Sequence, residues 1–249
     1  MNSQQEQILI ARTAELENAL SERLLELQHK NRELEIEAAL ERVRSRSMAM
    51  HQSTELTEVA DVLFQQLRSL GGNLWACGFV LCKPGAQDDE VWFANENGVL
   101  PPVTIPNTKD PTHNKMYEGW KNKMDLFTES LEGPALKAHY DYMLSLTSVN
   151  ALFENILASG LSFPTSQTWH AAYFKYGYVL TITLEAYPDE QVFIRFAKVF
   201  EQTYTRFLDL QKAEAQAREA QIQLALERVR ATAMAMHHSN EIPEVAHVI

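Results

Sequence analysis

A duplicated segment near the two ends of this 249-residue chain constrains its organisation more than any other feature. Residues 37–62 align with residues 223–248, and 16 of the 26 positions are identical. Both copies contain Ala-Leu-Glu-Arg-Val-Arg followed by Met-Ala-Met-His. A unit that recurs on both sides of an unrelated middle indicates a modular chain. The second copy reaches Ile249 within a helical pattern and without a stop signal, so we expect the polypeptide to continue.

Apolar residues in and around both copies recur at the steps of three, four and seven that are typical of a coiled coil. Long helices are therefore predicted from about residue 4 to 50 and from about residue 190 to 236. We expect each to pair in parallel with its counterpart in a second chain, which would make the protein a homodimer. The predicted interface residues are Leu20, Leu27, Leu34, Leu40, Val43, Ile222, Leu226 and Val229.

The middle of the chain mixes helical and strand patterns. A helix is predicted from Leu56 to Leu70, ended by Gly71-Gly72. Further predicted helices are residues 114–127, 133–146 and 149–159, and predicted strands are residues 75–82, 90–94, 103–105, 168–174 and 178–184. This order predicts an α+β fold, an antiparallel sheet with flanking helices between two long coiled-coil helices. The expected divisions are 1–52, 53–205 and 206–249.

Composition excludes several classes of function. The formal net charge of -11, with a pI near 5.2, argues against a nucleic-acid partner, which needs clustered Lys and Arg. The longest apolar run, residues 74–82, is too short to cross a membrane, and the polar N-terminus lacks a signal-peptide pattern. Cys77 and Cys82 lie roughly 16 Å apart on opposite faces of one strand, too far apart for a disulfide. We therefore expect a soluble cytoplasmic protein without membrane contact.

Several stretches together resemble the GAF-type sensor region of bacterial multi-domain signal-transduction histidine kinases, in which GAF-like domains recur on continuous signalling helices. They are the two Ala-Leu-Glu-Arg-Val-Arg segments, Arg195 to Arg218, Leu131-Glu-Gly-Pro-Ala-Leu136 and His139-Tyr-Asp-Tyr-Met-Leu-Ser-Leu146. The resemblance implies a GAF-like sensor domain at 53–205. It also implies a signal-input and dimerisation module of a two-component system, which passes a ligand or conformational signal through its helices.

The chain lacks the motifs of catalysis and of metal binding. His51 is followed by Gln52 rather than by the acidic residue of a phosphoacceptor box, and no Gly-rich ATP-binding segment is present. No His-Glu-x-x-His or paired Cys-x-x-Cys occurs, and His237 and His238 would point about 100° apart on a helix. We therefore expect no enzyme activity, no catalytic residue, no metal and no cofactor in this part of the protein.

Aromatic residues are the best candidates for a binding pocket, since the resemblance implies a pocket between the sheet and the inserted segments. The predicted ligand-binding residues are Trp92, Trp120, Trp169, His170 and Tyr173, for a small molecule of unknown identity. Strand alternation places Trp169 and His170 on opposite faces, so at most one of them can line the pocket.

Two alternatives to a sensor stay open. The domain could be a dimerising spacer that binds no ligand. It could also be an enzyme such as a GAF-type sulfoxide reductase, which requires a reactive thiol pair. Cys77 and Cys82 have no neighbouring Lys, Arg or His in the sequence to activate them, so we expect both to be packing residues.

Overall fold

The structure, a computed structural model, describes residues 3–158 and 162–235. The chain divides into two units, Met1–Glu201 and Gln202–Ile249. The first unit includes the N-terminal helix together with the central domain, and the expected divisions at residues 52 and 205 stay predictions. The predicted helix ends at Ser159 and Met236, His237-His238, and most of the second repeat copy lie outside the described residues.

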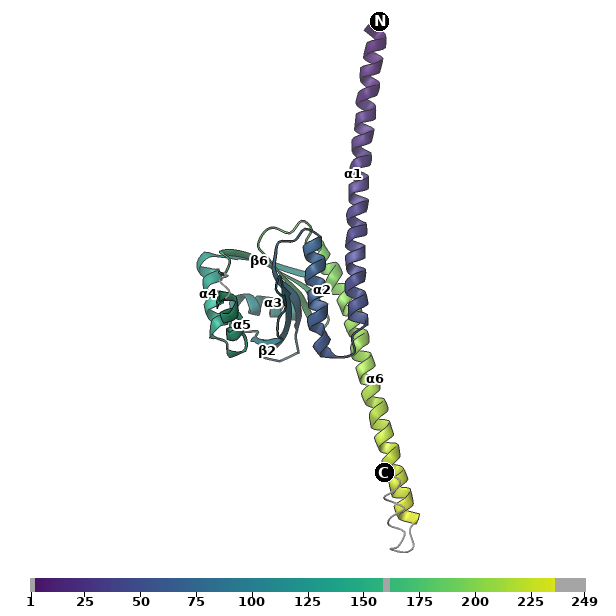
Figure 1. Ribbon diagram of the computed structural model, residues 1–249, viewed down its shortest axis with the longest axis vertical. Coiled ribbons are helices and arrows are strands. Elements are labelled where there is room, and N and C mark those ends of the chain that lie inside the picture. The colour runs from purple at the N-terminus through teal and green to yellow at the C-terminus, as the bar shows by residue number, and fades with distance from the viewer. Residues whose placement is uncertain (1–2, 159–161, 236–249) are drawn as a thin grey trace. The chain divides into compact units, whose positions relative to one another are not determined.

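Helix α1, Ser3–Met48, confirms the predicted N-terminal helix. Its first part is exposed, whereas its last turns pack along α2, Leu56–Ser69, after a short 3₁₀ turn at Ser53–Glu55 (Figure 1). Arg42 donates a hydrogen bond to Gln66, and Arg46 pairs with Glu58 across this contact. The two helices therefore form one layer on the domain.

Seven strands form one antiparallel sheet in the order β3-β2-β1-β7-β6-β5, with β4 paired to β2. They are β1 Leu74–Leu81, β2 Asp88–Asn95, β3 Gly98–Val99, β4 Val103–Pro106, β5 Leu126–Glu132, β6 Ser166–Phe174 and β7 Gly177–Thr183. The predicted hairpin of the last two strands is confirmed, and Gly177 begins β7 with a φ of 154°. A Cβ at Gly177 would lie 1.9 Å from the carbonyl oxygen of Val80, so the close approach of β1 and β7 requires glycine here.

Three helices are inserted between β4 and β6, and α4 and α5 lie on the side of the sheet opposite α2 (Figure 1). They are α3 Pro111–Lys121, α4 Gly133–Ser145 and α5 Thr147–Ala158. The last helix, α6, spans Gln191–Ala235. Within the first unit, the ring of Phe200 from this helix stacks on the ring of Phe79 from β1, with the ring centroids 3.7 Å apart. The predicted α+β class, an antiparallel sheet with flanking helices and long helices before and after, is confirmed.

The prediction of one helix over residues 114–127 is wrong at both ends. Asp110 caps the helix and Pro111 occupies its first turn, so α3 begins earlier than predicted. Lys123 adopts a positive φ of 55°, which ends the helical path, and Leu126–Glu132 then pairs with β6 as an edge strand. The alternating sequence Leu-Phe-Thr-Glu-Ser-Leu-Glu suits a strand with one solvated face.

The predicted coiled-coil seam is corrected at two positions. Leu40 and Val43 are 3% and 0% exposed within the chain, so they have no free surface to offer a second molecule. The remaining seam residues in α1, Leu20, Leu27 and Leu34, are 71%, 56% and 68% exposed. In the second unit, Ile222 and Leu226 are exposed and Val229 is half-buried. The four-three spacing does not distinguish a helix that packs on its own domain from one that pairs with another chain.

No helix among the described residues is long and apolar enough to cross a membrane.

Replacing Gly78 in β1 tests the tight packing of the sheet. A Cβ there would lie 1.9 Å from the carbonyl oxygen of Trp92 and 2.9 Å from the Cα of Phe93. We expect Gly78→Ala to lower the free energy of unfolding by at least about 2 kcal/mol in urea titrations, because backbone must move. At Gly98, where φ is 102° and no atom lies within 4 Å, alanine should cost only about 1 kcal/mol from backbone strain. Equal losses would contradict the assigned register.

Candidate functional site

A cavity lies between the sheet and the three inserted helices, within the first unit. Its volume is about 80 Å³, room for two or three water molecules at about 30 Å³ each. Apolar residues from β1, β2, β4, β6, β7, α4 and α5 form most of the wall, among them Phe93, Ile105, Met143 and Leu180. The polar exceptions in the wall are Asn95, His113 and His139. A small apolar chamber with a few polar groups is typical of a ligand site.

Asp110 organises the polar end of this cavity. It precedes α3 in an extended conformation, and its Oδ1 accepts hydrogen bonds from the backbone N–H groups of Thr112 and His113, both at 3.0 Å. The same oxygen lies 3.1 Å from Nδ1 of His113. The N-terminal end of a helix favours a negative charge, so the carboxylate suits this position.

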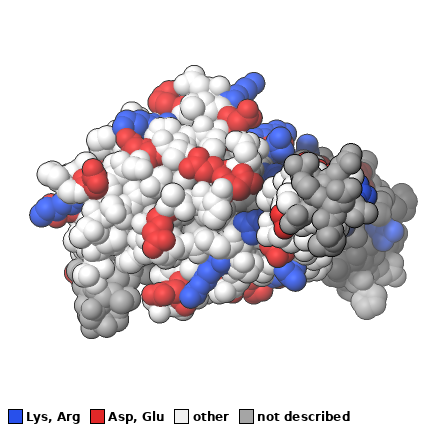
Figure 2. Space-filling view, turned by 90° about the horizontal axis from the view of Figure 1, so that it is seen from above, with Lys and Arg blue, Asp and Glu red and all other residues white. Residues whose placement is uncertain are grey.

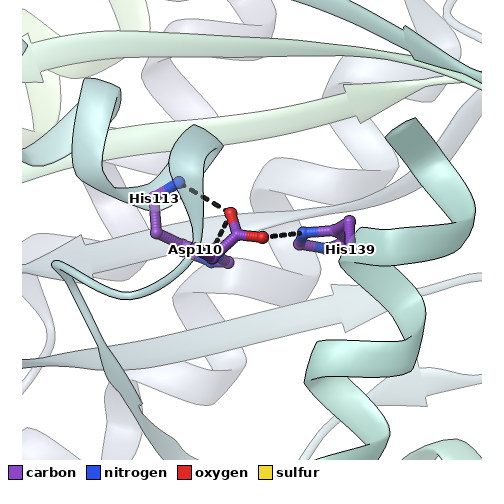
Figure 3. A group of neighbouring side chains, drawn as sticks. All are labelled: Asp110, His113 and His139. Carbon is purple, nitrogen blue, oxygen red and sulfur yellow. Dashed lines mark hydrogen bonds and ion pairs between the residues drawn. The ribbon is translucent and has the colours of Figure 1, made fainter. Parts of the chain in front are cut away.

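His139 reaches the same carboxylate from α4. Its Nδ1 lies 3.1 Å from Oδ2 of Asp110, so the carboxylate stands between two imidazoles that two different helices supply (Figure 3). The two imidazole rings are stacked with their centroids 5.5 Å apart. All three side chains are buried, at 3%, 6% and 4% exposure for Asp110, His113 and His139. We call these three residues the Asp-His-His cluster.

The cluster keeps its carboxyl group ionised. Burial by itself raises the pKa of Asp110, but hydrogen bonds from His113 and His139 outweigh it and hold the pKa well below its usual range. Burial lowers the pKa of His113, against the opposing effect of the Asp110 carboxylate. A neutral imidazole beside a carboxylate retains a lone pair, which is what a ligand or a metal ion needs.

Among the predicted ligand-binding residues, Trp169 is the one that lines the cavity. Its ring stands edge-on to His139 at 4.7 Å and to His113 at 5.8 Å. Its Nε1 is buried and has no hydrogen-bond partner among the described residues. A buried indole N–H usually has a partner, so this one is available to an occupant of the cavity. Whether Trp169 binds a ligand stays a prediction.

The structure does not bring the other predicted pocket residues to this cavity. Trp92 alternates with Val91 and Phe93, which line the cavity, and is itself absent from its wall. Trp120 and Tyr173 instead line an open hollow of about 650 Å³ with Tyr117, where Trp120 Nε1 donates to the carbonyl of Lys175. The five predicted residues therefore lie in different environments and do not line one cavity.

His170 faces away from the cavity, as its alternation with Trp169 requires. It is fully buried beside Phe193 of α6, and its Nε2 lies 3.1 Å from Oγ1 of Thr183. Its Nδ1 lies 3.4 Å from a carboxylate oxygen of Glu190, the charged group that faces it. The structure thus places the predicted pocket residue His170 in the hydrogen-bonded core and not in the wall of this cavity.

Sequence reasoning missed the Asp-His-His cluster. Asp110 and His113 are three positions apart, but His139 lies 29 positions from Asp110 on another helix, so no short metal or catalytic motif spans them. A local signal was present in Asp110-Pro-Thr-His113, because Asp before Pro is a helix-start pattern that points the third following residue back at its carboxylate. Only the fold brings in His139.

Both cysteines are buried and free. Burial raises the pKa of both thiols well above its usual range, and nearby Asp61 and Asp89 add to the effect at Cys77 and Cys82 respectively. A thiol with a raised pKa is a poor nucleophile, so the structure places both cysteines in packing roles.

On the face that Figure 2 shows, Lys and Arg are interspersed with Asp and Glu among uncharged residues. The predicted absence of a nucleic-acid partner stays a prediction.

Comparisons with known proteins give the following result. No family model matches the chain, and no curated protein matches it. Among solved structures, the chain is similar to a free methionine-R-sulfoxide reductase from Neisseria meningitidis in complex with its substrate. The TM-score is 0.41 and the identity 12%, over 70% of this chain and 91% of the other.

The burial of His170 predicts a loss of stability in acid. Burial lowers its pKa to about 4, from an ordinary value of about 6.5. Its contribution is therefore complete above about pH 6.5 and is lost as the pH falls towards 4, because the unfolded chain takes up the proton first. Between pH 7.5 and 5, urea unfolding of His170→Gln should lose about 2 kcal/mol less stability than the natural chain does. Equal losses would show that His170 does not titrate in this way.

Proposed function

We propose that the central domain is a small-molecule-binding sensor domain, and that this part of the chain is a signal-input module. One observation carries the proposal: a cavity between the sheet and the inserted helices, with a buried cluster that holds an ionised carboxylate at one end. Buried polar groups beside a cavity cost folding free energy. Their presence is therefore better explained by binding than by packing. The cavity of about 80 Å³ limits the occupant to a few non-hydrogen atoms unless the helices move apart.

The inserted helices supply a route by which an occupant could alter the domain. The cavity wall includes residues of α4 and α5, and these two helices pack on each other and on the sheet. A ligand that prefers one position of these helices by about 1 to 3 kcal/mol would shift the population of the domain. The sheet then connects this side to the layer formed by α1 and α2.

Pairing of α1 with a second copy is the second part of the proposal. The exposed leucines Leu20, Leu27 and Leu34 repeat every seven residues, and Leu9 and Leu16 extend the same stripe towards the N-terminus with 60% and 56% exposure. A stripe of this kind has no partner among the described residues, and a parallel coiled coil would bury it. The homodimer, its cytoplasmic location and a parent protein of the histidine-kinase type all belong to the proposal, which rests on the resemblance in the sequence.

The observations favour this function over the two alternatives. Buried thiols with raised pKa values argue against a sulfoxide reductase that works through Cys77 and Cys82. A spacer domain would have no need for three buried ionisable groups around a cavity. Binding measurements separate the spacer from the sensor.

Thermal unfolding in the presence of small metabolites tests ligand binding. A compound at 100 times its dissociation constant should add about 2.7 kcal/mol, which raises the Tm by about 5 to 10 °C in a domain of this size. Val103→Trp, which places a large side chain in the cavity wall, should abolish the shift. Val99→Trp on exposed β3 is the matched control and should keep it. If no small compound shifts the Tm of the natural chain at millimolar concentration, the spacer alternative is preferred.

Sedimentation analysis tests the proposed dimer. We expect the natural chain to be a dimer at micromolar concentration, and Leu20→Lys/Leu27→Lys to weaken it by at least about 100-fold, since like charges would face each other in the seam. Ile8→Lys/Leu25→Lys adds the same charge at exposed positions outside the seven-residue stripe and should leave the dimer intact. A monomeric natural chain, or equal effects of both variants, would contradict pairing through this stripe.

A further inference from the structure

We propose that the Asp-His-His cluster binds a divalent transition-metal ion, through the carboxylate of Asp110 and one nitrogen each of His113 and His139. The inference goes beyond the proposed sensor function, because the ion would bind whether or not the domain passes on a signal. It also names what would occupy the cavity, a metal ion together with a small exchangeable ligand.

The donor set suits such an ion. Imidazole nitrogens favour zinc, iron, cobalt, nickel and copper, whereas calcium and magnesium favour sites made of oxygen alone. Two imidazoles and one carboxylate are a combination found in sites that keep coordination positions open. Among the described residues, the three side chains of this cluster are the His, Cys, Asp or Glu groups that lie close enough together to bind one ion.

The distances between the side chains of the cluster fit the binding of one metal ion by all three. Two atoms bound to one ion at about 2.1 Å lie about 3.0 Å apart at a right angle and about 3.4 Å apart at a tetrahedral angle. The two distances from an Nδ1 to a carboxylate oxygen are both 3.1 Å. When the ion binds, the proton of each Nδ1 would move to Nε2 by exchange with solvent, which leaves the Nδ1 lone pair to the ion. All three ligand atoms lie within 4.8 Å of one another.

Neighbouring groups hold the three side chains of the cluster in place, as the residues around a metal site do. Asp110 is fixed by two backbone N–H donors at the start of α3, which hold its carboxylate in place. Trp169 packs edge-on against both imidazoles and restricts their rotation. Burial of the three side chains excludes bulk water, which would otherwise compete for the ion.

The open positions of the ion would face the cavity, because His113 and His139 both line it. Its volume of about 80 Å³ admits water or another ligand of two or three non-hydrogen atoms. The unpartnered Nε1 of Trp169 is the nearby donor that such a ligand could use. A metal with a small exchangeable ligand is therefore the occupant that this cavity accommodates without expansion.

Titration of the chelator-treated chain with Zn²⁺ and Co²⁺ tests the proposal. Calorimetry should show one ion per chain with a Kd below 1 μM, on the order of structural and catalytic protein sites. Co²⁺ should give visible absorption bands, and X-ray absorption should show two imidazoles and an oxygen donor. Binding with a Kd weaker than about 100 μM, or an absorption spectrum without imidazole scattering, would overturn the assignment.

Variants distinguish this site from adventitious binding. His113→Gln and His139→Gln should each weaken binding by at least about 100-fold. His170→Gln removes a buried histidine elsewhere in the core, and His237→Ala/His238→Ala removes the histidine doublet; neither should change the affinity. Loss of binding in the doublet variant alone would place the ion elsewhere. If the cluster variants do not fold, as circular dichroism would reveal, the X-ray absorption spectrum of the natural chain decides the question.

Discussion

The carboxylate of Asp110 is the interaction on which the functional side of the domain depends. It caps α3, contacts His113 one turn later and reaches His139 on α4, so a single side chain joins two inserted helices. Without the charge, two buried imidazoles would lose their common partner, and a buried polar group without a partner costs about 1 to 3 kcal/mol. The two imidazoles that line the polar end of the cavity, and with them the proposed metal site, depend on this carboxylate.

The same repeated motif meets two different environments in one chain. Leu40 is 3% exposed beside α2, whereas Leu226, its equivalent in the second copy, is 44% exposed. The motif therefore encodes an apolar face and leaves open what covers it. In the first copy the cover is the protein's own next helix, whereas the leucines upstream of it in α1 have no cover among the described residues. To predict whether an apolar stripe pairs with another chain, one has to consider whether the next helix of the same chain covers it.

Most of the fold was accessible from the sequence because its elements have strong local signals. Local patterns predict three of these elements: the helical spacing of apolar residues predicts α2, the fully apolar run predicts β1, and the glycine at 177 predicts the hairpin. Strand β5 was missed because Leu126–Glu132 has a partly polar, edge-strand pattern and follows a helix without Gly or Pro. Of the site, strand alternation separates Trp169 from His170 without saying which of them faces the cavity. The meeting of Asp110 with His139 depends on how α4 docks, which no local pattern encodes.

Hydrogen exchange of the Asp110→Asn variant, followed by mass spectrometry, measures how far this carboxylate holds α4 in place. Asparagine is a good helix cap, so α3 should keep its start, while the carboxylate that His139 contacts is lost. We expect faster exchange of the backbone amides of α4, with unchanged protection in β1 and β7, and no change in an Asp141→Asn control at an exposed position of α4. Unchanged protection of α4 in Asp110→Asn would contradict the claim that this carboxylate holds the cavity together.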